Sequence, residues 1–265
     1  MSLPGRPKGE YRSAQHEGTP VNPCLLAFDT STEQLAVGLW VGGAMLSYKG
    51  PGGALASMAL LPQIHSLMAQ AGVSLSQLDA IAFGRGPGAF TGLRTSCAVA
   101  QGLALGTGCP VLPLDSLLIV AEDARAQQPV AAVAAGFDIV VAMDARMNEV
   151  YAARYRWQSA QWSQVDAPAL VPLATLNQSW SGRAPQWVAG SALAAFGERL
   201  QLPCAAQPVP QEQDRCAALL RLAARAYADG AAVAADQALP LYLRDKVALT
   251  IQERVAARAA AGAAS

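Results

Sequence analysis

The sequence GRGPGAFTGLR, at residues 84–94, joins two apolar segments of different character. Residues 78–83 before it form a short apolar run that is typical of a buried strand, whereas residues 93–105 after it are small and apolar, which predicts a buried helix. The glycines therefore lie at a strand-to-helix junction, where positive φ angles and close backbone contacts favour residues without a side chain. We expect Thr91 to cap the helix with its hydroxyl group.

The first half of the chain reads as strands followed by alternating helices and strands. The expected strands are at residues 24–28, 35–41, 44–48, 78–83 and 109–114, and the expected helices at residues 60–71, 91–105 and 116–126. Gly42 and Gly43 form a hairpin turn, and Asp115 or Ser116 caps the third helix. Pro62 falls inside the first helical pattern, so that helix begins near it or bends there.

The second half repeats this beginning. Its expected strands are at residues 137–143, 149–155, 162–165 and 187–189, and its helices at residues 173–178, 192–200 and 216–228. Each half opens with a strand that ends in an aspartate, Asp29 or Asp144, and continues into a hairpin. The sequence therefore predicts a duplicated α/β unit.

We expect a disordered extension at residues 1–22, a first lobe at 23–126, a second lobe at 127–250 and a frayed tail at 251–265. The last helix of the second lobe is a candidate to pack back on the first. The extension is polar and lacks the apolar core of a signal peptide, which predicts a cytoplasmic protein.

The composition is apolar and weakly charged. Hydrophobic residues make up 52% of the chain, charged residues 14%, and the formal net charge is +0. A charged fraction this far below the usual quarter leaves apolar surface for a protein partner, and the lack of a basic field argues against tight direct binding of nucleic acid. The five cysteines form no CxxC pair, so we expect reduced thiols, most of them buried.

The two strand-end aspartates have the layout of a cleft that holds a nucleotide with magnesium. In that interpretation the glycine loop binds phosphate, and the residues in contact with it are Asp29, Thr30, Gly86, Gly88, Thr91 and Gly92. In the structural alternative the aspartates only end their strands, and the glycines let the helix pack closely on the sheet. The local sequence favours the alternative, above all at the second hairpin, where Arg146 and Met147 occupy a turn that a phosphate would need open.

Other chemistry has little support. The chain contains only two histidines, His16 in the extension and His65 on a predicted helix, so a metal site built on histidines is excluded by number. The sequence holds neither a GxSxG motif nor a GxxxxGK[ST] loop. We therefore expect no catalytic residues and no metal ligands.

Several motifs occur in the order seen in one known family. LLAFDTSTEQLAVGLW, FGRGPGAFTGLR, AQGLALGTGCPVLPLDSL, AMDARMNEVYAARY and PLYLRD extend over most of the chain. With these motifs the sequence resembles the TsaB family. Members of this family are the non-catalytic subunit of the bacterial machinery that makes threonylcarbamoyladenosine next to the anticodon of tRNA. The resemblance implies two ribonuclease-H-like lobes of the actin/Hsp70/sugar-kinase (ASKHA) superfamily, in agreement with the duplication.

The resemblance also implies the partners. TsaB pairs with its catalytic paralogue TsaD, joins the ATPase TsaE in a ternary complex and forms a homodimer, while tRNA is reached only through the complex. TsaD has a pair of metal-binding histidines that this sequence lacks, so the transferase activity does not carry over. No cofactor of its own is implied, although ATP or ADP with magnesium at the complex interface fits the glycine loop.

On the matching residues, the resemblance implies a partner surface on the two early helices. Its members are Leu60, Leu61, Ile64, His65, Leu67, Met68, Leu93, Ser96, Cys97, Ala100 and Ala104. From another class of function, the alternative is an ASKHA-type small-molecule kinase or ATPase that uses Asp29, the glycine loop and Asp144.

Overall fold

The structure is a computed structural model that describes residues 22–244. Apart from residue 22, the predicted extension at 1–22 lies outside the described residues, as does the predicted tail at 251–265. None of the helices between residues 22 and 244 has both the length and the apolar character that a membrane span requires.

The first lobe is built on a sheet of five strands in the order β3-β2-β1-β4-β5. Its first three strands are antiparallel, and β4 and β5 run parallel to β1. The strands are β1 (Leu25–Asp29), β2 (Gln34–Val41), β3 (Ala44–Pro51), β4 (Ala80–Gly86) and β5 (Val111–Asp115). Every residue of β1 is buried, because helices cover both faces of the sheet.

The second lobe repeats this topology. Its sheet has the order β8-β7-β6-β9-β10, with β6, β7 and β8 antiparallel and β9 and β10 parallel to β6. The strands are β6 (Phe137–Asp144), β7 (Glu149–Gln158), β8 (Gln161–Pro172), β9 (Trp187–Ala189) and β10 (Gln207–Val209). The predicted duplication of a ribonuclease-H-like unit is therefore confirmed.

Seven α-helices and four short 3-10 helices complete the described part of the chain. The α-helices are α1 (Ala56–Ala71), α2 (Phe90–Thr107), α3 (Ser116–Ala126), α4 (Val130–Val133), α5 (Leu173–Ser179), α6 (Ala192–Phe196) and α7 (Arg215–Ala228). The 3-10 helices are η1 (Gly53–Leu55), η2 (Leu75–Gln77), η3 (Gly197–Arg199) and η4 (Ala235–Gln237).

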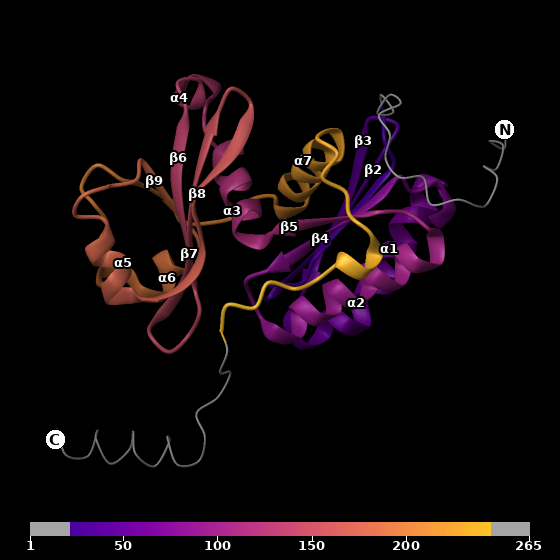
Figure 1. Cartoon of the computed structure of the whole chain (residues 1–265), viewed down its shortest axis with the longest axis horizontal. Helices are drawn as coiled ribbons and strands as arrows, with labels where there is room; N and C mark the ends of the chain where they lie inside the picture. Colours follow the sequence, from indigo (N-terminus) through magenta and orange to yellow (C-terminus); the bar gives the residue numbers. More distant parts are fainter. Residues whose placement is uncertain (1–21, 245–265) are drawn as a thin grey trace, which may run out of the picture.

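The alternation of side chains along β1 separates the core of the first lobe into two layers. Leu26 and Phe28 point to the face covered by α1 and α2, whereas Leu25 and Ala27 point to the face where α7 packs. Figure 1 shows α3 and α7 between the two sheets. Helix α7 contacts β1 and β2, so the first lobe is completed by a helix that follows the second lobe in sequence.

Some local predictions are corrected by the structure. Helix α1 begins at Ala56, with Pro62 inside it, and the predicted linker at 127–136 contains α4. The predicted helix at 192–200 is divided into α6 and η3, and β10 was not predicted. All five cysteines are unpaired, and Cys204 is exposed.

Candidate functional site

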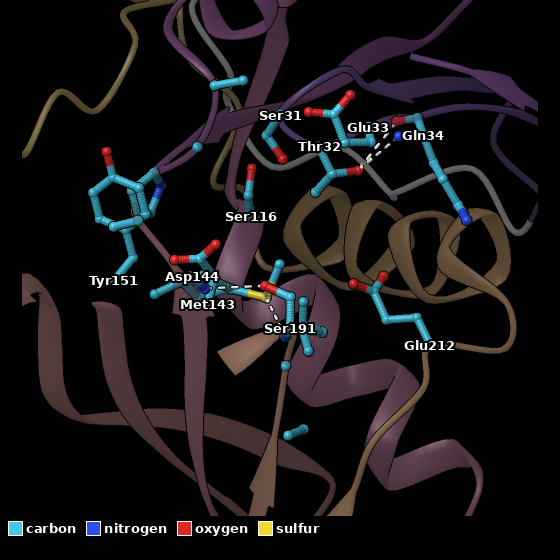
Figure 2. A pocket seen from close by; sticks show the side chains of 18 of the residues that line it. Ser31, Thr32, Glu33, Gln34, Ser116, Met143, Asp144, Tyr151, Ser191 and Glu212 are labelled. Atoms are coloured by element: carbon cyan, nitrogen blue, oxygen red, sulfur yellow. Dashed lines mark hydrogen bonds between the residues drawn. The ribbon is translucent and has the colours of Figure 1, made fainter. Parts of the chain in front are cut away.

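A cavity of about 760 Å³ lies between the lobes. The first lobe contributes the turn after β1 and the glycine loop after β4, and the second contributes the end of β6 and the turn that follows it. In Figure 2, Ser31 and Ser116 lie across the cavity from Asp144 and Ser191. This is the position of ligand sites in many open α/β sheets, beyond the carboxyl ends of the strands.

Asp29 is fully buried at the end of β1, and its carboxylate is engaged by the protein. It accepts hydrogen bonds from the amide of Ser31 (2.5 Å), the hydroxyl of Ser116 (3.0 Å) and Nη2 of Arg215 (3.1 Å). Burial by itself would raise the pKa of Asp29, but the charge of Arg215 and the hydrogen bonds from Ser31 and Arg215 outweigh it and lower the pKa. The carboxylate therefore stays ionised as one half of a buried ion pair.

Arg215, at the start of α7, is the partner that the sequence analysis missed. Its side chain is nearly fully buried, and its Nη1 also donates to Glu212 at 2.6 Å. These two carboxylates raise the pKa of Arg215 against the opposing effect of burial. Because 186 residues separate Arg215 from Asp29, no local pattern in the sequence connects them.

The glycine loop packs against the turn after β1. Thr30 is buried, and its hydroxyl donates to the carbonyl of Gly92 at 2.6 Å and lies 2.5 Å from the hydroxyl of Ser96. A Cβ atom on Gly92 would lie 1.8 Å from the carbonyl oxygen of Thr30, and one on Gly88 would lie 2.4 Å from that of Ser31. The geometry therefore supports the packing role of these glycines.

The remaining residues of the predicted phosphate loop have other roles. Gly86 has a φ of 109°, and its amide donates to the hydroxyl of Ser116 at 3.1 Å. Thr91 is exposed and does not cap α2: the N-cap is Ala89, whose amide donates to the carbonyl of Ser31 at 2.8 Å. The predicted cap was wrong because the helix begins before Thr91, at Phe90.

The turn after β6 contains an ion pair of its own. Asp144 accepts a hydrogen bond from the amide of Arg146 at 2.8 Å, and the guanidinium of Arg146 lies 3.4 Å from its carboxylate. Arg146, Met147 and Asn148 all have positive φ angles, of 65°, 57° and 58°. Such a conformation is costly for residues other than glycine and persists only where the surroundings hold it.

Both aspartates of the cleft thus have a guanidinium partner. A kinase-like cleft needs carboxylates that can bind the metal of a nucleotide or accept a proton from a substrate. Within residues 22–244, no three His, Cys, Asp or Glu side chains form a group suited to a metal ion. The ion pair of Asp29 is buried, whereas that of Asp144 is formed with an Arg146 side chain that is largely exposed.

The predicted partner surface is divided by the structure. Nine of its eleven residues are buried in the first lobe: Leu60, Ile64, Leu67, Met68, Leu93, Ser96, Cys97, Ala100 and Ala104. They pack against the sheet because they lie on the sheet-facing sides of α1 and α2. Only Leu61 and His65 of the predicted set are exposed.

The exposed sides of the same helices carry different residues. On α1, Met58, Leu61 and His65 follow each other at helical spacing and are all exposed, Met58 by 68%. On α2, small residues recur four apart at Ala98, Gly102 and Gly106, and these are exposed as well. We call these six residues the α1–α2 surface.

The glycines of the α1–α2 surface have no evident role within this chain. A Cβ atom on Gly102 or Gly106 would meet nothing within 4 Å. A glycine within a helix costs about 1 kcal/mol relative to alanine. Small residues spaced by four allow a second helix to approach closely.

Residues 56–264 match the family model of TsaD, described as tRNA N6-adenosine threonylcarbamoyltransferase. The chain is 32% identical over 231 residues to the tRNA threonylcarbamoyladenosine biosynthesis protein TsaB of Escherichia coli K12, with 84% of this chain and 96% of that protein covered. The TsaB protein of Haemophilus influenzae is 31% identical over 235 residues, with 85% and 95% covered.

Solved structures lead to the same family. The structure of YeaZ from Pseudomonas aeruginosa has a TM-score of 0.71 and 40% identity, and it covers 83% of this chain and 100% of its own. A second Pseudomonas aeruginosa structure, described as an uncharacterized protein similar to peptidase YEAZ, has a TM-score of 0.74 and 39% identity, with 84% and 100% covered. With its two duplicated lobes and these relatives, the chain belongs to the TsaB family.

Proposed function

We propose that this protein is a non-catalytic subunit of the complex that installs threonylcarbamoyl on the tRNA adenosine next to the anticodon. It acts in the cytoplasm by pairing with TsaD and holding it in a working state. Support comes from the names of the curated relatives and from the cleft, where Asp29 and Asp144 are held by arginines.

The observation that carries the pairing is the α1–α2 surface. Its exposed apolar residues and its glycines lower the stability of the isolated chain. A helix from a partner that packs against them would offset this loss. The same surface serves TsaD or a second copy of this chain, and TsaE joins the mixed complex. We propose that tRNA is bound only through the complex, and that ATP or ADP with magnesium, if used, sits where the subunits meet.

The test is to replace Met58 by glutamate and to measure the mass of mixtures with TsaD from the same organism by size-exclusion chromatography with light scattering. A charge buried in a packed helix interface removes at least 2 kcal/mol of binding, so we expect the dissociation constant to rise about 30-fold or more. The reconstituted transfer of threonylcarbamoyl to tRNA falls in parallel at limiting subunit concentration.

Met45→Glu is the matched control. Met45 is also an exposed methionine, 51% accessible, but it lies on β3, outside the α1–α2 surface. Pairing at wild-type strength in Met58→Glu, or equal loss in both variants, contradicts the proposed surface.

A further inference from the structure

Residues 239–244, with the sequence LPLYLR, cross from one lobe to the other beside the cleft. We call this segment the strap. In Figure 1 it leaves η4 on the first lobe and runs toward the hairpin of β6 and β7. Its residues 241–244 line the cavity between the lobes. The strap is thus a further connection between the lobes, separate from the passages of the chain through α3 and through the segment before α7.

The first end of the strap is bound to the glycine loop and to α2. The amide of Leu241 donates to the carbonyl of Arg85 at 2.7 Å. The ring of Tyr242 lies 5.1 Å from that of Phe90, between ring centroids, and its hydroxyl accepts a hydrogen bond from Nε of Arg94 at 3.2 Å. The guanidinium of Arg94 in turn lies 3.9 Å from the centre of the Phe90 ring.

Within the described residues, the other end is bound to the turn after β6 through Arg244. Its Nη2 donates to the carbonyl of Ala145 at 2.9 Å and lies 2.7 Å from the carboxylate of Glu149, and its Nη1 lies 3.5 Å from the sulfur of Met147. The Arg244 side chain is 15% exposed, so the ion pair is largely shielded from water. It therefore holds both sides of the turn in which three residues have positive φ angles.

A second set of contacts joins the lobes around Glu122, and we call it the Glu122 pivot. Glu122 of α3 is fully buried and accepts hydrogen bonds from Arg125 at 2.8 Å, from Arg221 of α7 at 2.6 Å and from the indole of Trp162 on β8 at 2.9 Å. Its pKa is lowered, because these hydrogen bonds outweigh the effect of burial. A buried network of hydrogen bonds at Glu122 and, among the described residues, the contacts of Arg244 at the end of the strap are the two elements that a hinged closure needs.

We propose that the strap is a latch that couples the glycine loop of the first lobe to the β6–β7 turn of the second, with Arg244 as the releasable contact. Released, the lobes open about the Glu122 pivot, and the β6–β7 turn loses the contacts that hold its conformation. The coupling works in both directions, because the strap is bound at both ends.

Hydrogen exchange of the full chain, followed by mass spectrometry, tests this coupling. Arg244→Ala cuts the strap from the second lobe, and we expect exchange to become ~10-fold faster in residues 145–149 and also in residues 84–90 of the other lobe. Tyr242→Ala removes the contacts of the strap with Phe90 and Arg94 in the first lobe, and we expect exchange to rise in residues 145–149 of the second lobe as well.

Two controls separate the latch from local or general destabilisation. Arg146→Ala removes a guanidinium from the same turn, but that group pairs only with Asp144 within the turn, so exchange in residues 84–90 stays at the wild-type rate. Exchange in β1 remains slow in all three variants if the fold is intact. The latch is refuted if each strap variant changes only the lobe in which its own contact lies, or if neither variant changes exchange at all.

Discussion

Asp29 has a position that would suit the binding of a metal-bound nucleotide, but it forms an ion pair with Arg215. A carboxylate at the end of the first strand, beside a cavity, is well placed for a metal-bound nucleotide. Here it is instead the partner of a buried guanidinium from α7, and it accepts hydrogen bonds from the amide of Ser31 in the adjacent turn and from the hydroxyl of Ser116 at the start of α3. A buried ion pair contributes little by itself, but removing one partner leaves the other charge without compensation.

Asp29→Asn is therefore expected to destabilise the protein by about 3–5 kcal/mol at neutral pH. The control is Asp166→Asn, because Asp166 pairs with Arg183 on the surface, where both side chains are about half exposed. That variant should change the free energy of unfolding by less than about 1 kcal/mol. Urea unfolding measures the free energy of unfolding of both variants. Equal losses would show that the buried pair matters no more for stability than the surface pair.

The pKa shift of Asp29 gives this difference a pH dependence. Its pKa is lowered in the folded state, so the contribution of its charge is complete above the unfolded pKa of about 3.9 and is lost as the pH falls through the lower folded value. The stability gap between wild type and Asp29→Asn should accordingly shrink below about pH 4. If the difference in unfolding free energy stayed constant until Asp29 is fully protonated, the charge of Asp29 would not be the source of the stabilisation.

At the scale of the residue, the sequence predicted the positions of some site residues in the fold but not of others. Asp29 and Asp144 were located at strand ends because an apolar run stops at each of them. Arg215 and Arg244 gave no such signal, since each acts through a contact with residues about 100 or more positions away. Thr91 was assigned a cap from its residue type, whereas backbone packing of Ala89 decided the helix start.

At the scale of the element, the glycines of helix α2 fall into two groups with different surroundings. Gly92 faces the turn after β1 at a distance that leaves no space for a side chain, whereas Gly102 faces open space. The sequence shows both as small residues at helical spacing. Only the position of the sheet distinguishes glycines needed inside the lobe from those available to a partner.

The two groups are expected to respond in opposite ways to alanine. Gly102→Ala should stabilise the isolated chain by about 1 kcal/mol, since helix propensity improves and nothing is in the way. Gly92→Ala should destabilise it, because its Cβ would lie 1.8 Å from a backbone oxygen. Denaturant unfolding gives both signs, and light scattering with TsaD shows whether Gly102→Ala weakens pairing as close helix packing requires. A loss of stability in Gly102→Ala would contradict the assignment.

Elements with a strong apolar pattern were predicted well, and those defined by contacts were not. The strands at the start of each half matched because apolar runs and hairpin glycines specify them locally. Helix α1 was expected either to begin near Pro62 or to bend there. It begins earlier, at Ala56, where Ala56 and Leu60 are buried, and it contains Pro62. Strand β10 has three residues and a proline, so only its pairing with β9 defines it.

At the scale of the whole molecule, the duplicated lobes enclose a cavity, and several carboxylates in it or beside it pair with arginines. Asp29 and Glu212 share Arg215, Asp144 has Arg146, and Glu149 has Arg244. We take this pairing as support for the proposed subunit over the alternative of a kinase or ATPase.

We therefore expect no change in the melting temperature of the isolated chain on addition of magnesium-ATP. A ligand at 100 times its dissociation constant would stabilise the folded state by about 2.7 kcal/mol, which a thermal unfolding scan detects readily. Addition of TsaD should raise the melting temperature by the same mass action. Stabilisation by magnesium-ATP alone, with hydrolysis of the nucleotide, would instead favour the enzyme.

The return of α7 to the first lobe has a consequence for how the protein is made. A ribosome releases the chain from its N-terminus, and domains generally fold in that order. Here Leu25 and Ala27 lie on a face of the first sheet that is covered by Leu219 and Leu220 of α7. Because α7 is synthesised after the whole second lobe, this face stays uncovered until then. The lobe that begins first is therefore finished last, and its exposed apolar face during synthesis is a natural client for a chaperone.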